Sequence, residues 1–312
     1  MVIDISVIIP AYNEHRSILL LYQRIVDSLK DLNKSFEIIF IDDGSNDETF
    51  DRIKLICKKD VRVIGLRFSK NFKKSAAYMA GFEKSSGKII ITMDADLQDE
   101  ASEIPRMIRA LDKLDLVVGW KYPRQDPFYK RFPSKIFNRL NKTLFGVKLH
   151  DNDCGFRAMK SEVAKSLSLY GDLYRYIPAL SSRNGFKIGE IKVKHNKRQF
   201  GKSKYGWKRL ITGPLDLLTV KVITDYNQRP LHLFGTAGIG SFFIGFLAEV
   251  YVVCMKFFAN NTFSTHLPMM IFGVLLMLLG VQLLGIGLVA ELVTSSRTEK
   301  RYKLVEVLNH EK

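Results

Sequence analysis

Cysteine is scarce in this chain of 312 residues, which contains only Cys57, Cys154 and Cys254. The three cysteines are odd in number, lie far apart and form no Cys-x-x-Cys pair, which argues against a disulfide framework and a cysteine-rich zinc site. We therefore expect a reducing compartment. A secretion signal is also lacking, because the N-terminus carries Asp4 where a signal peptide needs basic residues before a longer apolar core.

Acidic residues are too few to balance the basic ones. The chain has 32 Asp and Glu against 48 Lys and Arg, a formal net charge of +16. Such an excess neutralises phosphate groups, whichever molecule carries them. A membrane-tethered nucleic-acid-binding protein is therefore one alternative. The sequence has no recognisable recognition helix, RNP motif or zinc finger to support it, so we expect no nucleic-acid partner.

Charge almost disappears between residues 231 and 293, which marks the main domain boundary. Residues 268 to 290 contain no charged residue, and as a helix they would span about 35 Å against a hydrocarbon thickness of about 30 Å. Residues 233 to 255 are similar but contain Glu249, which near mid-bilayer costs about 2.5–3.5 kcal/mol. We predict two transmembrane helices that form an anchor over residues 231–294.

Small residues recur every fourth position in the first of these helices, at Ala237, Ser241 and Gly245. Such a stripe lets helices approach closely, either within the chain or between chains, so a homo-oligomer is possible. The loop between the two helices has no Lys or Arg, whereas a basic tail over residues 295–312 follows them. By the positive-inside rule we expect an integral protein of the inner or plasma membrane, with its catalytic domain and both termini cytoplasmic.

The rest of the chain alternates short apolar runs with helical patterns. Residues 5 to 9, 36 to 41, 61 to 66, 89 to 93 and 116 to 118 are predicted to be buried parallel strands. Strands that alternate with helices predict a doubly wound α/β sheet. Ligands bind beyond the carboxyl ends of the strands in such sheets, so the residues at those ends are candidate site residues.

Polar residues follow three of the predicted strands, in the segments Pro10-Ala-Tyr-Asn-Glu14, Asp42-Asp-Gly-Ser45 and Asp94-Ala-Asp-Leu-Gln98. Each could serve as a turn or helix cap, as Asn46 or Asp47 could for a helix that begins near Glu48. Carboxylates gathered at one sheet edge would repel one another. A bound divalent cation that also holds a diphosphate would relieve that repulsion.

These segments resemble glycosyltransferase family 2, in particular its polyprenyl-phosphate branch, which includes dolichol-phosphate mannose synthases and bactoprenol glucosyltransferases. Four motifs occur in the family's order: Ser6-Val-Ile-Ile-Pro-Ala-Tyr-Asn-Glu14, Ile41-Asp-Asp-Gly-Ser45, Met93-Asp-Ala-Asp-Leu-Gln98 and Asp153-Cys-Gly-Phe-Arg157. The resemblance covers residues 2 to 229. It implies a GT-A fold, a Rossmann-like and mostly parallel sheet, for a catalytic domain over residues 1–230.

The resemblance also implies which residues bind the nucleotide-sugar donor. Asp94 and Asp96 would hold Mg²⁺ or Mn²⁺ on the diphosphate. The other implied donor-binding residues are Pro10, Tyr12, Glu14, Asp42, Asp43, Gln98, Arg198 and Lys204. One departure is visible, because Lys73 stands where the family often has glycine in an Arg-Asn-Phe-Gly segment.

A phosphate acceptor makes modest demands on the enzyme's acid–base chemistry. With a second pKa of about 6, a phosphate monoester is already mostly dianionic at neutral pH. Orientation and charge stabilisation should then matter more than a strong base. Asp153 is the first candidate for a base or acceptor-orienting group, Asp151 is the second, and Asp96 acts through the metal. Asp153 could instead be a turn residue before Gly155.

Two basic amphipathic stretches, at about residues 131–147 and 205–226, are predicted to lie in the lipid headgroup layer. Packing of the first stretch on the sheet is the alternative. The candidates for binding the acceptor phosphate or lipid are Arg124, Arg131, Lys135, Arg139, Arg157 and Ser203.

The sequence thus predicts a hexosyltransferase that moves a single sugar to polyprenyl phosphate, with inversion implied by the resemblance. UDP-glucose is the first-choice donor, and GDP-mannose or another UDP-sugar is the alternative. A processive polysaccharide synthase fits less well, because the sequence lacks a Gln-x-x-Arg-Trp motif and has too few spans.

Overall fold

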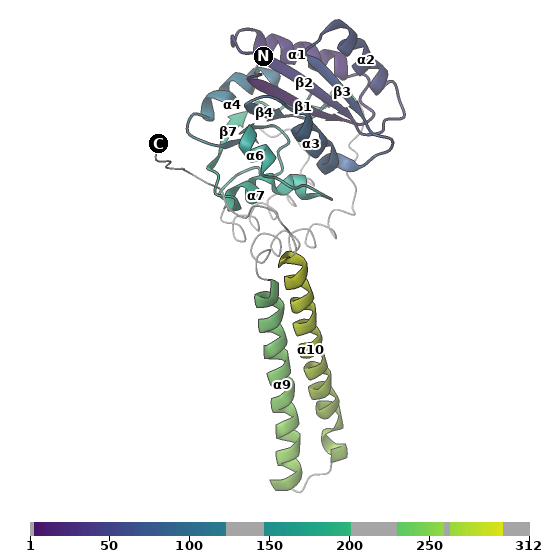
Figure 1. Cartoon of the computed structure of the whole chain (residues 1–312), viewed down its shortest axis with the longest axis vertical. Helices are drawn as coiled ribbons and strands as arrows, with labels where there is room; N and C mark the ends of the chain where they lie inside the picture. The colour runs from purple at the N-terminus through teal and green to yellow at the C-terminus, as the bar shows by residue number, and fades with distance from the viewer. Residues whose placement is uncertain (1–2, 123–146, 201–229, 259–262, 296–312) are drawn as a thin grey trace, which may run out of the picture. The chain divides into compact units, whose positions relative to one another are not determined.

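A computed structural model describes residues 3–122, 147–200, 230–258 and 263–295 of the chain (Figure 1). The chain forms two compact units, Met1–Leu217 and Leu218–Lys312. The first unit contains the sheet and the second contains a pair of long helices.

The sheet has seven strands in the order β3-β2-β1-β4-β6-β5-β7. The five predicted strands all form, as β1 (Ile5–Ala11), β2 (Phe36–Asp42), β3 (Val63–Arg67), β4 (Ile89–Thr92) and β5 (Leu116–Lys121). Strands β1 to β4 pair in parallel, and most of their residues are apolar and buried in the core. The predicted α/β fold with a mostly parallel sheet is therefore confirmed.

Two strands were not predicted. Strand β6 (Arg157–Lys160) lies antiparallel between β4 and β5, and β7 (Ile188–Val193) pairs in parallel with β5 at the edge of the sheet. Both strands contain charged residues, so neither has the continuous apolar run of β1 or β2. Strand β6 brings the Asp153-Cys-Gly-Phe-Arg157 motif to the carboxyl end of β4, next to the predicted metal site.

Helices connect the strands. They are α1 (Ile18–Lys30), α2 (Thr49–Lys59), α3 (Lys73–Lys84), α4 (Ile104–Ala110), α6 (Ser161–Lys165) and α7 (Ile177–Arg183), with short 3-10 turns η1 (Ala101–Glu103) and η2 (Leu173–Tyr176). Helix α1 contacts α2 and α4, whereas α3 contacts α6 and η2. Helix α1 buries Ile18, Leu21, Ile25 and Leu29, at the helical spacing that predicted it.

Two elements of the sheet unit begin later than predicted, and β1, β2, β4 and β5 begin as predicted but end one to three residues away from the predicted position. Strand β3 begins at Val63, not Val61, because Val61 is 99% exposed in the turn after α2. Helix α2 begins at Thr49, one residue later than expected. Its first backbone N–H, that of Thr49, donates to Asp47 Oδ1 at 2.9 Å, so Asp47 satisfies one N-terminal amide of the helix.

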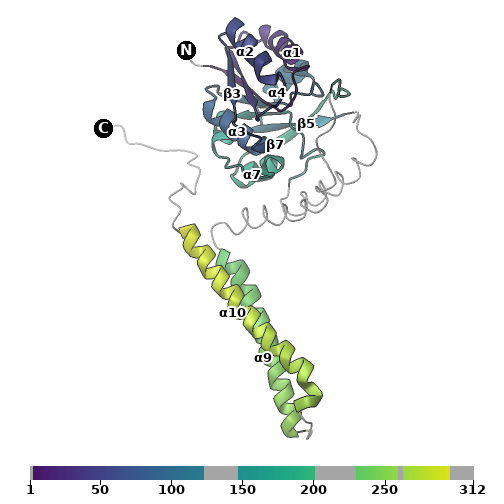
Figure 2. The same ribbon diagram turned by 90° about the vertical axis from the view of Figure 1, so that its right-hand side faces the viewer.

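The second unit consists of α9 (Pro230–Phe258) and α10 (Leu267–Ser295), with the turn η3 (Phe263–His266) between them in the sequence. The two helices run antiparallel and lie side by side (Figure 2). Both helices are long and apolar enough to cross a membrane, as predicted. Their large apolar side chains point mostly outward and are exposed. This is the reverse of a soluble helical hairpin and fits a lipid environment.

Glycine forms the contact between these two helices. A Cβ on Gly238 would lie 2.7 Å from the Gly280 carbonyl oxygen, and Ser241 Oγ donates to the Leu276 carbonyl oxygen at 2.8 Å. A Cβ on Gly245 would collide with the Gly273 carbonyl oxygen, and a Cβ on Gly273 would lie 3.1 Å from the Gly245 carbonyl oxygen. The predicted small-residue stripe therefore packs α9 on α10 within the chain at Ser241 and Gly245. Ala237 is exposed, and Gly238 takes its place in the contact.

Candidate functional site

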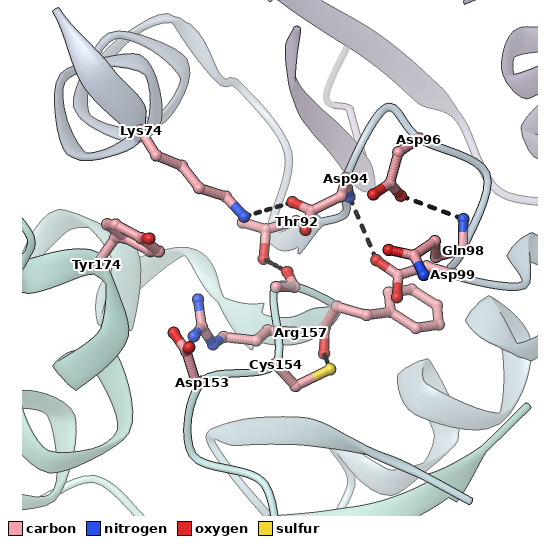
Figure 3. A network of polar contacts seen from close by, with 12 residues as sticks. Lys74, Thr92, Asp94, Asp96, Gln98, Asp99, Asp153, Cys154, Arg157 and Tyr174 are labelled. Atoms are coloured by element: carbon pink, nitrogen blue, oxygen red, sulfur yellow. Dashed lines mark hydrogen bonds and ion pairs between the residues drawn. The ribbon is translucent and has the colours of Figure 1, made fainter. Parts of the chain in front are cut away.

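The loop after β4 carries the two aspartates that were predicted to bind a metal. Strand β4 ends at Thr92, and Asp94 and Asp96 follow at the carboxyl end of the parallel strands (Figure 3). Leu97 has a left-handed backbone (φ 62°), and the Gln98 N–H donates to Asp96 Oδ1 at 3.2 Å. This tight turn keeps both aspartates at the sheet edge.

Each of these carboxylates pairs with a cation. The Lys74 ammonium forms an ion pair with Asp94 Oδ1, and Arg198 Nη2 lies 2.7 Å from Asp96 Oδ2. Burial alone would raise the pKa of Asp94, but the charges of Lys74 and Lys121 outweigh burial and hold that pKa below its ordinary value. Asp94 is therefore ionised at neutral pH.

The backbone places Arg198 at this loop. Asp99 and His195 form an isolated antiparallel bridge, and the Asn196 N–H donates to the Gln98 carbonyl oxygen at 2.9 Å. Burial alone would lower the pKa of Arg198, but Asp96 raises it above its ordinary value. Arg198 was predicted to bind the donor, and it lies beside the predicted metal ligand Asp96.

A buried ion pair between Asp99 and Lys121 supports the loop that carries Asp94 and Asp96. Asp99 is 3% exposed, accepts the Asp94 N–H at Oδ2 (3.3 Å), and has Lys121 Nζ 3.3 Å from Oδ1. Burial raises the pKa of Asp99, although Lys121 opposes that shift. Lys121 ends β5, so the pair joins the β4 loop to β5, across the intervening strand β6.

The paired aspartates fit a hard divalent cation. Carboxylate oxygens suit Mg²⁺ and Mn²⁺, and Mg²⁺ is commonly held by one or two carboxylates together with substrate phosphates and water. Over the described residues, no group of three or more His, Cys, Asp or Glu side chains is arranged around one metal position. Asp94 and Asp96 would therefore supply only part of a coordination sphere, and a bound diphosphate would complete it.

The segment after β1 lies against the same loop. Pro10 is in β1 and Tyr12 follows it, while Glu14 is almost buried and its Oε1 lies 3.8 Å from Arg198 Nη1. Arg198 thus faces carboxylates from two predicted donor-binding motifs. The structure brings together Glu14, Asp96 and Arg198, which are far apart in the sequence.

The two aspartates at the carboxyl end of β2 accept hydrogen bonds from the backbone around them. Asp42 is fully buried, accepts the Ser45 N–H at 3.1 Å and lies 3.3 Å from Arg67 Nε. Asp43 accepts the Phe72 N–H at 2.7 Å, and burial raises its pKa. Asp43 therefore fixes the loop that precedes α3.

That loop contains the departure from the family pattern. Lys73, where glycine is usual, has a left-handed backbone with φ 70°, a region that favours glycine. The opposing turn needs a glycine too, because Gly44 (φ 70°) lies so close to the Lys70 backbone that a Cβ would collide with it. The close packing of these two segments keeps Lys73 in its strained conformation and sets the start of α3.

The Asp153-Cys-Gly-Phe-Arg157 motif runs directly beside Asp94. The Thr92 hydroxyl donates to the Gly155 carbonyl oxygen at 2.8 Å, and a Cβ on Gly155 would lie 2.8 Å from Asp94 Oδ1. Cys154 is buried, which raises the pKa of its thiol to about 12 and leaves it unreactive. The motif's glycine thus gives the Asp94 carboxylate room.

Asp153 forms an ion pair with an arginine from the turn η2. Arg175 Nε is 3.9 Å from Asp153 Oδ1, and Arg175 is itself almost buried. Burial alone would lower the pKa of Arg175, but Asp153 and Tyr174 raise it above its ordinary value. Asp151, the second candidate, is 4% exposed and so is less accessible than Asp153.

Arg157 was predicted to bind the acceptor phosphate, and it is fully buried. Its Nη2 lies 3.5 Å from the Asn152 carbonyl oxygen, whereas Nε and Nη1 have no hydrogen-bond partner within the described residues. The guanidinium therefore lies behind the exposed part of the site. Direct contact with a lipid phosphate would require the site to open around it.

Several predicted residues lie outside the described part of the chain. They are Arg124, Arg131, Lys135, Arg139, Ser203 and Lys204, together with nearly all of the two amphipathic stretches and the basic tail. Sequence reasoning did not identify Lys74, Asp99, Lys121, Tyr174 or Arg175. Lys74 and Asp99 had a sequence signal, because each directly follows a residue that was singled out, Lys73 and Gln98 respectively.

Comparisons with known proteins agree with this geometry. A model of glycosyl transferase family 2 matches residues 6–168. The chain is 35% identical to a dodecaprenyl-phosphate galacturonate synthase of Rhizobium johnstonii, over 93% of this chain and 88% of that protein. It is 34% identical to an undecaprenyl-phosphate 4-deoxy-4-formamido-L-arabinose transferase of Pseudomonas aeruginosa, over 92% of this chain and 84% of that protein.

A solved structure shows the same fold. The glucosyl-3-phosphoglycerate synthase of Mycobacterium tuberculosis, crystallised with Mn²⁺ and UDP-glucose, superposes with a TM-score of 0.52 at 20% identity, over 70% of this chain and 78% of that one. The matched family model covers the strands and loops that carry Asp94, Asp96 and Asp153. The chain belongs to glycosyltransferase family 2 and is a glycosyltransferase.

Proposed function

We propose that this enzyme transfers a single sugar from a nucleotide-sugar to the phosphate of a polyprenyl lipid. The observation that carries the proposal is the pair Asp94 and Asp96, which lies at the carboxyl edge of a parallel sheet and faces Lys74 and Arg198. Such a site suits a metal-bound diphosphate. Relatives that align along more than nine-tenths of the chain are named as polyprenyl-phosphate transferases or synthases, which supports a lipid phosphate as acceptor.

The first-choice donor has to be corrected. UDP-glucose was expected, but the two relatives are named for galacturonate and 4-deoxy-4-formamido-L-arabinose. The alternative of another UDP-sugar replaces it. We infer a donor whose sugar carries a carboxylate or a formamido group, neither of which glucose has.

A divalent cation held by Asp94 and Asp96 would neutralise charge on the departing diphosphate. Mg²⁺ and Mn²⁺ both suit these ligands. The enzyme's own residues would then bind the donor and orient it. In this proposal Arg198 would contact the diphosphate beside Asp96, and Lys204 follows in the same segment. Pro10, Tyr12 and Glu14 would contact the nucleoside, while Asp42, Asp43 and Gln98 would keep the surrounding loops in position.

The acceptor phosphate is the nucleophile. As a dianion at neutral pH it has no proton to lose before attack, so the enzyme must mainly align it and shield its charge. Asp153 is placed to orient the acceptor, and Arg175 fixes the Asp153 carboxylate at 3.9 Å. Attack from behind the anomeric carbon would invert its configuration.

Membrane attachment would bring the site to the lipid. Helices α9 and α10 form the proposed anchor, and the charge distribution favours a cytoplasmic catalytic domain with both termini on the same side. The stretches at residues 131–147 and 205–226 would lie in the headgroup layer, where Arg124, Arg131, Lys135, Arg139 and Ser203 could bind the acceptor.

The test uses the full chain purified in detergent. It is incubated with polyprenyl phosphate, Mn²⁺ or Mg²⁺, and a panel of radiolabelled nucleotide-sugars that includes UDP-galacturonate and UDP-4-deoxy-4-formamido-L-arabinose. The expected product is a lipid that carries one labelled sugar and forms only with metal. A polymer of sugars, or no labelled lipid from any donor in the panel, would contradict the proposal.

A further inference from the structure

A positively charged side chain pairs with each of the two predicted metal ligands. Lys74 pairs with Asp94, and Arg198 pairs with Asp96. The two carboxylates are therefore neutralised by two side-chain cations before any ligand arrives. Arg198 belongs to a segment that was expected at the donor phosphates, but nothing assigned a role to Lys74.

The surroundings of Lys74 hold its ammonium in this position. Its side chain is only 16% exposed, and Nζ lies 5.5 Å from the centre of the Tyr78 ring and 5.3 Å from that of Tyr174 (Figure 3 shows Lys74, Asp94 and Tyr174). Contacts of a cation with aromatic faces strengthen as water is excluded. The Tyr174 N–H donates to Ser75 Oγ at 3.2 Å, which fixes this ring against the start of α3.

We propose that Lys74 is an exchangeable counter-ion of the donor site: it neutralises Asp94 while the site is empty, and passes to the donor's diphosphate when a divalent cation takes Asp94. The inference rests on the proposed function. The exchange leaves every charge paired, because the metal replaces the ammonium at Asp94, and the diphosphate neutralises both the released ammonium and the second charge of the metal. No covalent bond changes.

The exchange makes metal and diphosphate depend on each other. A metal that binds alone must displace Lys74 from Asp94, and the bound divalent cation then repels the neighbouring ammonium. A diphosphate that binds alone finds Lys74 already paired. Bound together, each ligand removes the other's penalty, so their binding is positively coupled, and the coupling is reciprocal. Lys74 is in this sense a positioning residue for the metal and a ligand for the diphosphate.

The test measures Mn²⁺ binding to the full chain in detergent by electron paramagnetic resonance, with and without UDP. Lys74→Met removes the charge but keeps the length of the side chain. We expect Mn²⁺ alone to bind Lys74→Met about two- to tenfold more tightly than the wild type, since an ion pair of this kind is worth about 0.5–1.4 kcal/mol. The gain in Mn²⁺ affinity on adding UDP should shrink at least as much.

Two controls separate this role from a structural one. Lys84→Met removes an exposed lysine from the other end of α3 and should leave both Mn²⁺ affinities unchanged. Lys74→Arg keeps the charge and should retain most of the coupling. A general loss of structure would weaken Mn²⁺ binding and could not tighten it.

The outcomes are distinguishable. If wild-type protein binds Mn²⁺ and UDP but Lys74→Met binds Mn²⁺ alone no more tightly, the counter-ion role is wrong while the proposed function stands. If the wild type binds neither Mn²⁺ nor UDP, and Lys74→Met also fails to bind Mn²⁺, both are overturned.

Discussion

The two units of the chain place their side chains by opposite rules. In the sheet unit, large apolar residues such as Phe40 and Ile9 are fully buried, and charged groups are paired around one edge. In the helical unit, large apolar residues such as Leu247 and Leu292 are exposed, and glycines fill the contact. Water drives apolar groups inward, whereas lipid does not, so helices in lipid associate through close backbone packing. Function should therefore be most sensitive to charge in one unit and to side-chain size in the other.

The largest expected effect comes from removing one of the paired charges. Asp94→Asn should lower glycosyl transfer by about 100- to 1,000-fold, because the metal loses a carboxylate ligand and the diphosphate loses its support. Initial rates of labelled lipid formation at saturating Mn²⁺ measure this loss. Asp112→Asn, in the turn after α4, is the matched control and should leave the rate unchanged. Metal-dependent turnover near the wild-type rate in Asp94→Asn would contradict the metal assignment.

The expected sensitivity of the helical unit to side-chain size is tested by placing a larger side chain at a glycine in the contact between α9 and α10. In Gly245→Leu the new side chain would meet the Gly273 carbonyl and the Met277 backbone, and we expect a loss of about 1–3 kcal/mol from overpacking. Gly240→Leu is the control, since nothing lies within 4 Å of its Cβ position. Size-exclusion chromatography after heating in detergent should show earlier aggregation only for Gly245→Leu. Equal behaviour of the two variants would mean that the helices do not pack through this face.

A smaller effect is expected where charge orients rather than binds a metal. Asp153→Asn should lower kcat by about 10- to 100-fold, because an amide keeps the shape but no longer pairs with Arg175. Asp172→Asn removes the other carboxylate near Arg175, at 3.6 Å, and should stay within a few-fold of the wild type. Activity of Asp153→Asn within a few-fold would remove Asp153 from the chemistry.

The smallest effect concerns charge used for stability alone. Hydrogen bonds from Arg62 lower the pKa of Asp60 from its ordinary 3.8 to about 2. A depressed carboxyl pKa adds stability that is present above about pH 4 and is lost as pH falls towards 2. Asp60→Asn should thus be less stable than the wild type by about 1–2 kcal/mol at neutral pH.

Thermal unfolding followed by tryptophan fluorescence at several pH values checks this expectation. The difference between Asp60→Asn and the wild type should shrink below pH 4. Asp51→Asn breaks only an exposed 3.5 Å pair with Lys54 and should change stability by about 0.5 kcal/mol or less. A difference between Asp60→Asn and the wild type that stays constant down to pH 3 would show that the pair does not titrate as described.

An element could be predicted from the sequence where a single local pattern determines it. Continuous apolar runs located β1 to β5, and uncharged length located α9 and α10. The carboxyl-edge rule predicts that Asp94 and Asp96 lie at the sheet edge. Strand β6 was missed because only two apolar residues lie between Arg157 and Lys160, and β7 was missed because Gly189, Glu190 and Lys192 interrupt its apolar pattern.

The partners of the site residues were harder to predict, because they come from distant segments. No local pattern links Lys74 to Asp94 or Arg175 to Asp153, since these pairs arise only when α3 packs on β1 and β2, and η2 packs on α3. The small-residue stripe was found one position away at Ala237, because glycines at Gly238 and Gly280 let the backbones meet there.

Gly155 makes the motif at residues 153–157 depend on the motif at residues 93–98. The missing side chain at Gly155 is the space in which the Asp94 carboxylate lies, so neither position can change shape without the other. An alanine at 155 would push on Asp94 even though it touches no ligand. The spacing between the two motifs along the chain can drift freely during evolution, but this glycine and this aspartate have to be inherited together.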